Sequence, residues 1–82
     1  MTKIEEKDLQ AMGFNATTAN NSKFQKNVKQ GSVVLIKNGS GYLPQLTLVA
    51  NEFKPVVHYE QIDDLDRLKL FDKKIMNGDI VF

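Results

Sequence analysis

The sequence predicts an α+β fold in which an antiparallel sheet packs against amphipathic helices. The aliphatic run Val33 to Ile36 precedes the turn pair Asn38-Gly39, a combination typical of a β-hairpin. Near the C-terminus apolar residues recur at intervals of three and four, which is the spacing of a helix. A charged N-terminal segment ends at a glycine, which favours a further helix there. We therefore expect two N-terminal helices, a three-stranded antiparallel meander, a C-terminal amphipathic helix and a short terminal strand.

The chain before Gly31 is expected to form the two N-terminal helices. The first runs from Ile4 to Met12 and carries acidic residues near its N-terminal end, where the helix dipole favours negative charge. Gly13 ends it, and Asn15 or Thr17 can cap the second helix, which would continue to the next glycine. Its polar residues compete for backbone hydrogen bonds, so tertiary packing would have to hold it. Its inward-facing residues would be Ala19, Phe24 and Val28.

The three strands of the meander are expected between residues 33 and 59. The return strand of the hairpin, Tyr42 to Ala50, alternates between apolar and polar residues, as in a sheet with one buried face. Pro44 has no backbone N–H and is expected to place the start of this strand at a sheet edge. A third strand, Phe53 to Tyr59, follows after a turn.

The C-terminal helix has the most regular apolar spacing in the chain. Aspartates occupy its first turns, and Lys73 and Lys74 its last turn, so that both ends complement the helix dipole. Asn77-Gly78 is expected to cap it, and Asp79 to Phe82 to form the short terminal strand. The apolar stripe that would pack on the sheet consists of Ile62, Leu65, Leu68, Phe71 and Ile75.

Length and composition restrict the class of protein. The 82 residues fit a single domain over residues 1–82, with no linker or repeat to divide it. There is no cysteine, which excludes disulfides and thiolate zinc sites and fits a reducing compartment. The N-terminus has no apolar signal region, and the longest apolar run is far too short to cross a membrane. We expect a cytoplasmic protein without membrane contact.

Few residues could carry catalysis. His58 is the only histidine, so a single chain cannot form a histidine-rich metal site, and no serine is placed to form a triad with it. Asp63 and Asp66 lie one helical turn apart and could bind a divalent cation, but their position at a helix N-terminus accounts for both carboxylates. We expect a binding protein rather than an enzyme, with no metal or cofactor.

The charges are unevenly distributed along the chain. Between Asp8 and Glu52 there is no acidic residue, while several lysines fall within this stretch. This asymmetry favours an anionic partner for the middle of the chain. The alternative interpretation of this charge asymmetry is that the middle of the chain forms a solvated surface that happens to lack carboxylates and has no anionic partner.

A motif in the N-terminal half suggests what this partner is. In the segment Asp8 to Ala19, apolar residues around Gly13 are followed by short polar residues, and the segment resembles a helix-turn-helix. The hairpin that follows, with its glycine-rich tip beside a lysine, resembles the wing of winged-helix proteins. The resemblance covers residues 7–49 and implies a DNA-binding domain. The side chains expected to contact bases or phosphates are Asn15, Thr17, Thr18, Lys23, Lys26, Lys29 and Lys37.

A second function is open as well. In size and composition the chain resembles small accessory proteins of phages and mobile elements. This implies an inhibitor or adaptor that binds a host protein, for example a nucleic-acid-processing or defence enzyme. The contact with a basic groove would be the acidic start of the C-terminal helix, at Asp63, Asp64 and Asp66. A sheet edge also leaves room for pairing with a second copy of the chain.

Overall fold

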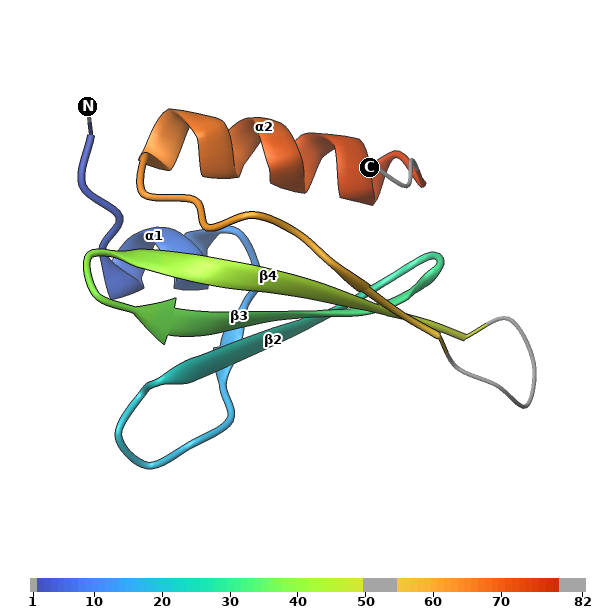
Figure 1. The fold of residues 1–82 in the computed structure, drawn as a ribbon, viewed down its shortest axis with the longest axis horizontal. Coiled ribbons are helices and arrows are strands. Elements are labelled where there is room, and N and C mark those ends of the chain that lie inside the picture. Colours follow the sequence, from blue (N-terminus) through green and yellow to red (C-terminus); the bar gives the residue numbers. More distant parts are fainter. Residues whose placement is uncertain (1, 50–54, 79–82) are drawn as a thin grey trace.

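The computed structural model describes residues 2–49 and 55–78, which contain two helices and five strands (Figure 1). Neighbouring strands pair antiparallel, and their order across the sheet follows their order in the sequence. The fold is a five-stranded antiparallel meander with one helix before it and one after it. In chain order the elements are α1 (Glu6–Ala11), β1 (Asn15–Ala16), β2 (Lys23–Val28), β3 (Gly31–Asn38), β4 (Gly41–Leu48), β5 (Val56–His58) and α2 (Leu65–Met76).

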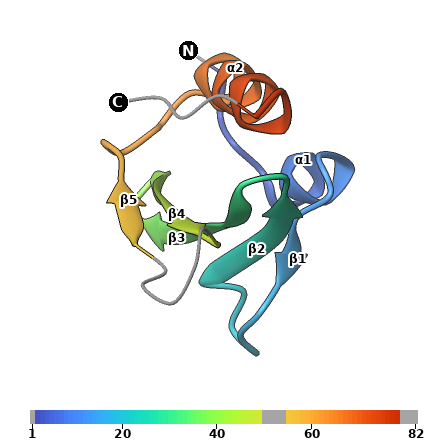
Figure 2. The same ribbon diagram turned by 90° about the vertical axis from the view of Figure 1, so that its right-hand side faces the viewer.

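Both helices pack on the same face of the sheet, and the strands curl around that side (Figure 2). Successive side chains of a strand point to opposite faces, so every second residue is directed into this core. Phe24, Leu35 and Leu46 of the sheet are fully buried, as are Leu9 of α1 and Leu68 of α2. The other buried apolar side chains are Ile4, Phe14, Val33, Tyr42, Pro44, Leu65, Phe71 and Ile75.

The predicted second N-terminal helix is absent, and the prediction of a three-stranded meander is wrong. Residues 23–28 instead form β2, which pairs with β3 along its whole length. The side chains of β2 alternate, so that Phe24 is buried in the core while Gln25 is exposed on the opposite face. With β1, this segment adds two strands to the three that the sequence predicts.

The turn before β2 explains why no helix forms there. Asn21 adopts a left-handed backbone conformation with φ 56°, which asparagine tolerates better than most residues. The backbone N–H of Ser22 donates to the side-chain oxygen of Thr18 over 3.1 Å, and the N–H of Thr17 donates to the carbonyl of Lys23 over 2.9 Å. Short polar side chains thus satisfy backbone groups locally and compete with helical hydrogen bonds.

The helix α1 is shorter than predicted at both ends, and the predicted Gly13 follows its C-cap, Met12. Gly13 has φ +95°, a conformation that glycine adopts without the strain that a Cβ would add. The N–H of Phe14 donates to the carbonyl of Leu9, and the N–H of Gly13 donates to that of Gln10, each over 3.0 Å. These are the two bonds of a Schellman motif, and they direct Phe14 into the same core as Leu9.

Pro44 lies in β4 between β3 and β5, and not at a sheet edge as predicted. Its carbonyl accepts the N–H of Tyr59 over 3.1 Å, one residue after β5 ends at His58. In an antiparallel pair the N–H and C=O of one residue face the same neighbouring strand, so the N–H that proline lacks would also face the β5 side. The next backbone contact of β4 on this side is the isolated bridge between Tyr42 and Ile62, beyond the end of β5. The proline is tolerated because the neighbouring chain leaves the regular ladder beside it.

The hairpin of β3 and β4 has Gly39 and Ser40 as its two loop residues, one position later than the expected pair Asn38-Gly39. Gly39 has φ +62° and Ser40 does not have a positive φ, which fits a type II′ turn with glycine at its first position. The predicted third strand is described only as the short β5. Residues 53–54 of that prediction and the predicted terminal strand, 79–82, lie outside the described residues.

The helix α2 begins at Leu65, later than the apolar stripe suggests. Ile62 precedes the helix, and its backbone exchanges hydrogen bonds of 2.9 and 3.0 Å with that of Tyr42. The four remaining members of the stripe are buried and cover the sheet. These residues are Leu65, Leu68, Phe71 and Ile75.

Replacing Leu68 with alanine should lower the free energy of unfolding by about 2 to 5 kcal/mol, because it leaves a cavity in the centre of the core. Leu70 provides a matched control, since it lies on the same helix and is 54% exposed. Leu70→Ala should change the free energy of unfolding by no more than about 0.5 kcal/mol. Equilibrium unfolding in urea, followed by circular dichroism, measures both. Equal unfolding midpoints for the two variants would contradict the packing of α2 on the sheet.

Candidate functional site

The residues predicted to contact nucleic acid lie on separate parts of the molecule. Asn15 and Lys23 are exposed on the face of the sheet that points away from the helices. Thr17 and Thr18 lie in the turn between β1 and β2, where both hydroxyl groups form hydrogen bonds within the turn. Lys37 lies near the tip of the β3–β4 hairpin. The fold does not gather these side chains on one surface.

Lys26 points into the molecule, where it connects three elements. Its ammonium group forms an ion pair with Asp72 of α2 and donates to the carbonyl of Met12, after α1, over 2.7 Å. It also lies 4.7 Å from the centre of the Phe14 ring, a distance typical of a cation–π contact. A Cβ at Gly13 would come within 3.2 Å of the Lys26 stem, so the glycine leaves room for it. Because the Lys26 side chain is only 10% exposed, the fold engages it rather than an external phosphate.

Asp64, predicted as a protein contact, has a structural role at the start of α2. Its carboxylate accepts the backbone N–H of Thr2 over 2.7 Å and that of Arg67 over 3.3 Å. The second bond makes Asp64 the N-cap of the helix. The hydrogen bond from Thr2, followed by that from Arg67 and the positive charge of Arg67, holds the pKa of the Asp64 carboxyl below its ordinary value.

The other two residues predicted to contact a protein, Asp63 and Asp66, are more exposed than Asp64. Asp63 accepts a hydrogen bond from Gln61 over 2.6 Å, and Gln61 in turn donates to the carbonyl of Asn38 in the hairpin. Asp66 is exposed in the first turn of α2. The acidic start of α2 is therefore partly an internal network that connects the helix to the β3–β4 hairpin.

The solvent-exposed side of α2 is positively charged. Asp72 turns inward to Lys26, so Asp66 is the one carboxylate on the exposed side of this helix. The four cationic residues of α2 are exposed, and within the described residues none of them forms an ion pair. Leu70, also exposed, lies among them. We refer to this set as the α2 cationic face, which consists of Arg67, Lys69, Lys73 and Lys74.

Lys29 extends the α2 cationic face beyond the C-terminal end of the helix. The β2–β3 turn lies beside this end in Figure 1, and the side-chain amide of Gln30 donates to the carbonyl of Ile75 over 3.2 Å. A Cβ built on Gly78 would lie 3.9 Å from the Lys29 stem. Among the exposed lysines predicted from the sequence, Lys29 is therefore the one that lies beside the C-terminal end of α2.

The outer face of the sheet is different in character. The register of the strands places one row of side chains across all five of them, and in this row uncharged amides predominate. His58 ends the row on β5, where it is exposed. The row consists of Asn15, Gln25, Val34, Gln45 and His58.

The sequence raised metal binding at Asp63 and Asp66 as a possibility, and it indicated no membrane span. Within residues 2–49 and 55–78, no group of three or more histidine or acidic side chains is placed to hold a metal ion. In the same part of the chain, no helix is long and apolar enough to cross a membrane.

Replacing Lys26 with methionine keeps most of the apolar stem and removes the charge, which leaves the carboxylate of Asp72 without its partner. We expect the free energy of unfolding to fall by about 1 to 3 kcal/mol. A double-mutant cycle with Asp72→Asn should give a coupling energy of about 0.5 to 3 kcal/mol in urea unfolding experiments. Lys23→Met, at an exposed lysine of the same strand, is the control and should be nearly neutral. A coupling energy of zero would contradict a stabilising ion pair.

Replacing Asp64 with alanine should lower the melting temperature at neutral pH. The folded protein holds the pKa of this carboxyl below its ordinary value of 3.8, so the ionised group stabilises the fold above that pH. This contribution is lost as the pH falls through the lower pKa of the folded state. Thermal melts between about pH 2 and pH 7 should therefore show a difference between parent and variant that shrinks on acidification. A difference between parent and Asp64→Ala that stays constant over this pH range would refute the prediction.

Comparison of the chain with models of known protein families, with curated proteins and with solved structures finds no match. The comparisons do not bear on the resemblance to winged-helix proteins, while the second helix of that motif is replaced by β2. The charges and contacts of the molecule are therefore the basis on which its function is inferred.

Proposed function

We propose that this protein binds nucleic acid, and that the α2 cationic face together with Lys29 contacts the phosphate backbone. The observation that carries this proposal is the set of exposed cations on one side of α2 without ion pairs to described residues. Unpaired lysines and arginines on one surface attract a polyanion and release its condensed counterions on binding.

The dimensions of the cationic face suit a backbone contact. Arg67 and Lys74 are seven residues apart, which is about 10 Å along a helix, and the phosphates of one strand are spaced by about 3.4 Å along the duplex axis. The face therefore extends over about three phosphates. Arginine can bind a phosphate with two parallel hydrogen bonds, while the lysines act as point charges.

The composition of the face favours binding without strong sequence preference. Its described side chains are four long cations with Leu70 and Asp66 among them, and α2 has no asparagine or glutamine that could pair with adenine in two places, so that Arg67 and the lysines, which can pair with guanine, are its possible base contacts. Phosphate contacts fix the position of a protein on the duplex but carry no sequence information directly. The proposed role is that of a non-enzymatic protein that associates with nucleic acid through its charge.

The alternative of an acidic surface that binds a host protein has weaker support. Asp64 caps α2 and binds the N-terminal segment, and Asp63 takes part in the contact with the hairpin. This leaves Asp66 as the predicted acidic contact without a hydrogen bond to the described residues, and it lies next to the cations of α2.

The Lys69→Gln/Lys73→Gln double variant should bind a labelled DNA duplex more weakly than the parent. These lysines are one helical turn apart on the exposed side of α2, so their loss should reduce the slope of log affinity against log salt by about two. Fluorescence anisotropy over a series of salt concentrations measures this slope. Two duplexes of unrelated sequence should lose affinity to the same extent.

A second double variant, Lys7→Gln/Lys23→Gln, is the control because it removes the same charge elsewhere. Lys7 pairs with Glu5 on the surface, and Lys23 lies on the outer face of the sheet. The control should retain nearly the slope of the parent. The proposal fails if the parent shows no binding at low salt, or if both double variants lose the same slope.

A further inference from the structure

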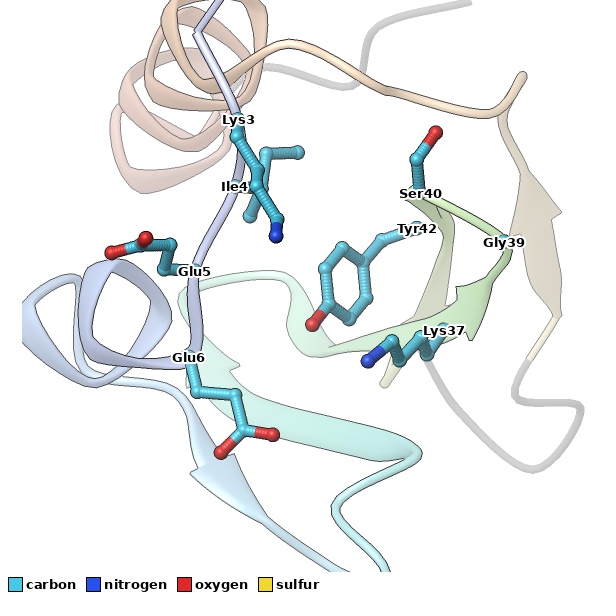
Figure 3. A pocket seen from close by; sticks show the side chains of 8 residues that line it. All are labelled: Lys3, Ile4, Glu5, Glu6, Lys37, Gly39, Ser40 and Tyr42. Carbon is cyan, nitrogen blue, oxygen red and sulfur yellow. The ribbon is translucent and has the colours of Figure 1, made fainter.

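A hollow of about 540 Å³ lies between the N-terminal segment and the tip of the β3–β4 hairpin (Figure 3). It is separate from the α2 cationic face, since no residue of α2 lines it. Tyr42 lies at its centre in Figure 3, with Lys3 and Lys37 on two sides of the ring. Tyr42 is 3% exposed, and its ring packs edge-on against Phe24 with 6.2 Å between centroids, so the core holds the phenol in place.

The side chains of Lys3, Lys37 and Tyr42 offer hydrogen-bond donors to this hollow that have no partner among the described residues. Lys3 and Lys37 form no ion pair there, and the hydroxyl group of Tyr42 forms no hydrogen bond there. Burial, followed by the negative charge of Glu6, raises the pKa of the Tyr42 hydroxyl above its ordinary value. The phenol therefore keeps its proton at neutral pH and can donate it in a hydrogen bond.

The two carboxylates that line the hollow, Glu5 and Glu6, have different partners. Glu5 forms an ion pair of 3.2 Å with Lys7, and in Figure 3 its carboxylate points away from Tyr42. Glu6 accepts a hydrogen bond of 3.2 Å from the side-chain amide of Asn21. Glu6 keeps its negative charge, because the amide of Asn21 is neutral, and it lies close enough to Tyr42 to raise the pKa of its hydroxyl. Among the described residues, the charges of the hollow without an ion pair are therefore Lys3, Lys37 and Glu6, which leaves an excess of positive charge.

We propose that this hollow is a binding site for a phosphomonoester group. The ammonium groups of Lys3 and Lys37 would contact the dianionic phosphate, and the hydroxyl of Tyr42 would donate a hydrogen bond to it. Charge-assisted hydrogen bonds of this kind are the strongest that side chains offer. The volume exceeds what a phosphate alone requires and lies in the range of pockets that hold small organic ligands, so an attached sugar or nucleoside fits as well.

This binding site does not depend on the nucleic-acid binding proposed for α2. The phosphomonoester could belong to a free nucleotide or to the 5′ end of a nucleic-acid strand, and ligand titrations distinguish these two sources. Adenosine monophosphate stands for a free nucleotide, and a dinucleotide with a 5′-phosphate stands for the end of a nucleic-acid strand. Adenosine and the same dinucleotide with a 5′-hydroxyl are the matched ligands without the group. Amide resonances of the full chain are followed in NMR titrations. We expect saturable shifts near Lys37 and Tyr42 for a phosphorylated ligand and none for its unphosphorylated counterpart.

Two variants connect binding to the proposed contacts. Lys37→Gln should weaken adenosine monophosphate binding by about tenfold or more. Tyr42→Phe removes the hydroxyl while it keeps the buried ring, so it should weaken binding several-fold at an unchanged melting temperature. Lys23→Gln, with the same loss of charge on the outer face of the sheet, should bind like the parent.

Three outcomes would overturn this assignment. They are the absence of saturable shifts with every phosphorylated ligand, equal binding of adenosine and adenosine monophosphate, and unchanged affinity in both Lys37→Gln and Tyr42→Phe. The Lys69→Gln/Lys73→Gln variant separates the two proposals. It should bind adenosine monophosphate like the parent even where it loses affinity for a duplex, because α2 does not line the hollow.

Discussion

The side chain of Lys26 connects the parts of the molecule that the sheet alone would not hold together. Its ammonium group lies at the junction of β2, the end of α1 and the middle of α2, where it contacts Asp72, the Met12 carbonyl and the Phe14 ring. A charge in this position is costly unless it is paired and hydrogen-bonded, and here both conditions are met. Together with the buried apolar stripe of α2, the ion pair therefore sets the rotation of the helix about its axis, with Asp72 directed inward.

This rotation determines the charge of the surface. With Asp72 inside and Asp64 used as the N-cap, the exposed side of α2 is left with four cations and one carboxylate. The number of acidic residues in the C-terminal part of the sequence suggests the opposite sign. A carboxylate that accepts hydrogen bonds from groups within the molecule contributes less to the recognition of a partner than a carboxylate exposed to solvent does.

Asp64 has a similar influence on the other end of the molecule. It binds the backbone of Thr2, and the N–H of Leu65 donates to the Thr2 carbonyl over 2.8 Å. These contacts hold the N-terminal segment beside the start of α2, and the same segment carries Lys3 along the wall of the hollow above Tyr42. Gly41 allows the close approach on the hairpin side, because a Cβ there would come within 2.6 Å of the Ile62 carbonyl. The cap of α2 and the shape of the hollow are therefore parts of one arrangement.

By itself the sequence determined the elements that depend on neighbouring residues: the β3–β4 hairpin around its glycine turn, the end of α1 at Gly13, and the apolar stripe of α2. Only the tertiary structure decided that residues 23–28 form a strand. Phe24 reaches the core because β2 pairs with β3, and this pairing is not encoded in the local propensities of the turn before β2.

The candidate sites depend still more on long-range contacts. Whether Lys26 and Asp72, 46 residues apart, face solvent or each other is a matter of packing, and so is the meeting of Lys3, Lys37 and Tyr42 around one hollow. Composition fixes how many charges a chain carries, while the fold decides which of them neutralise each other and which remain for a partner.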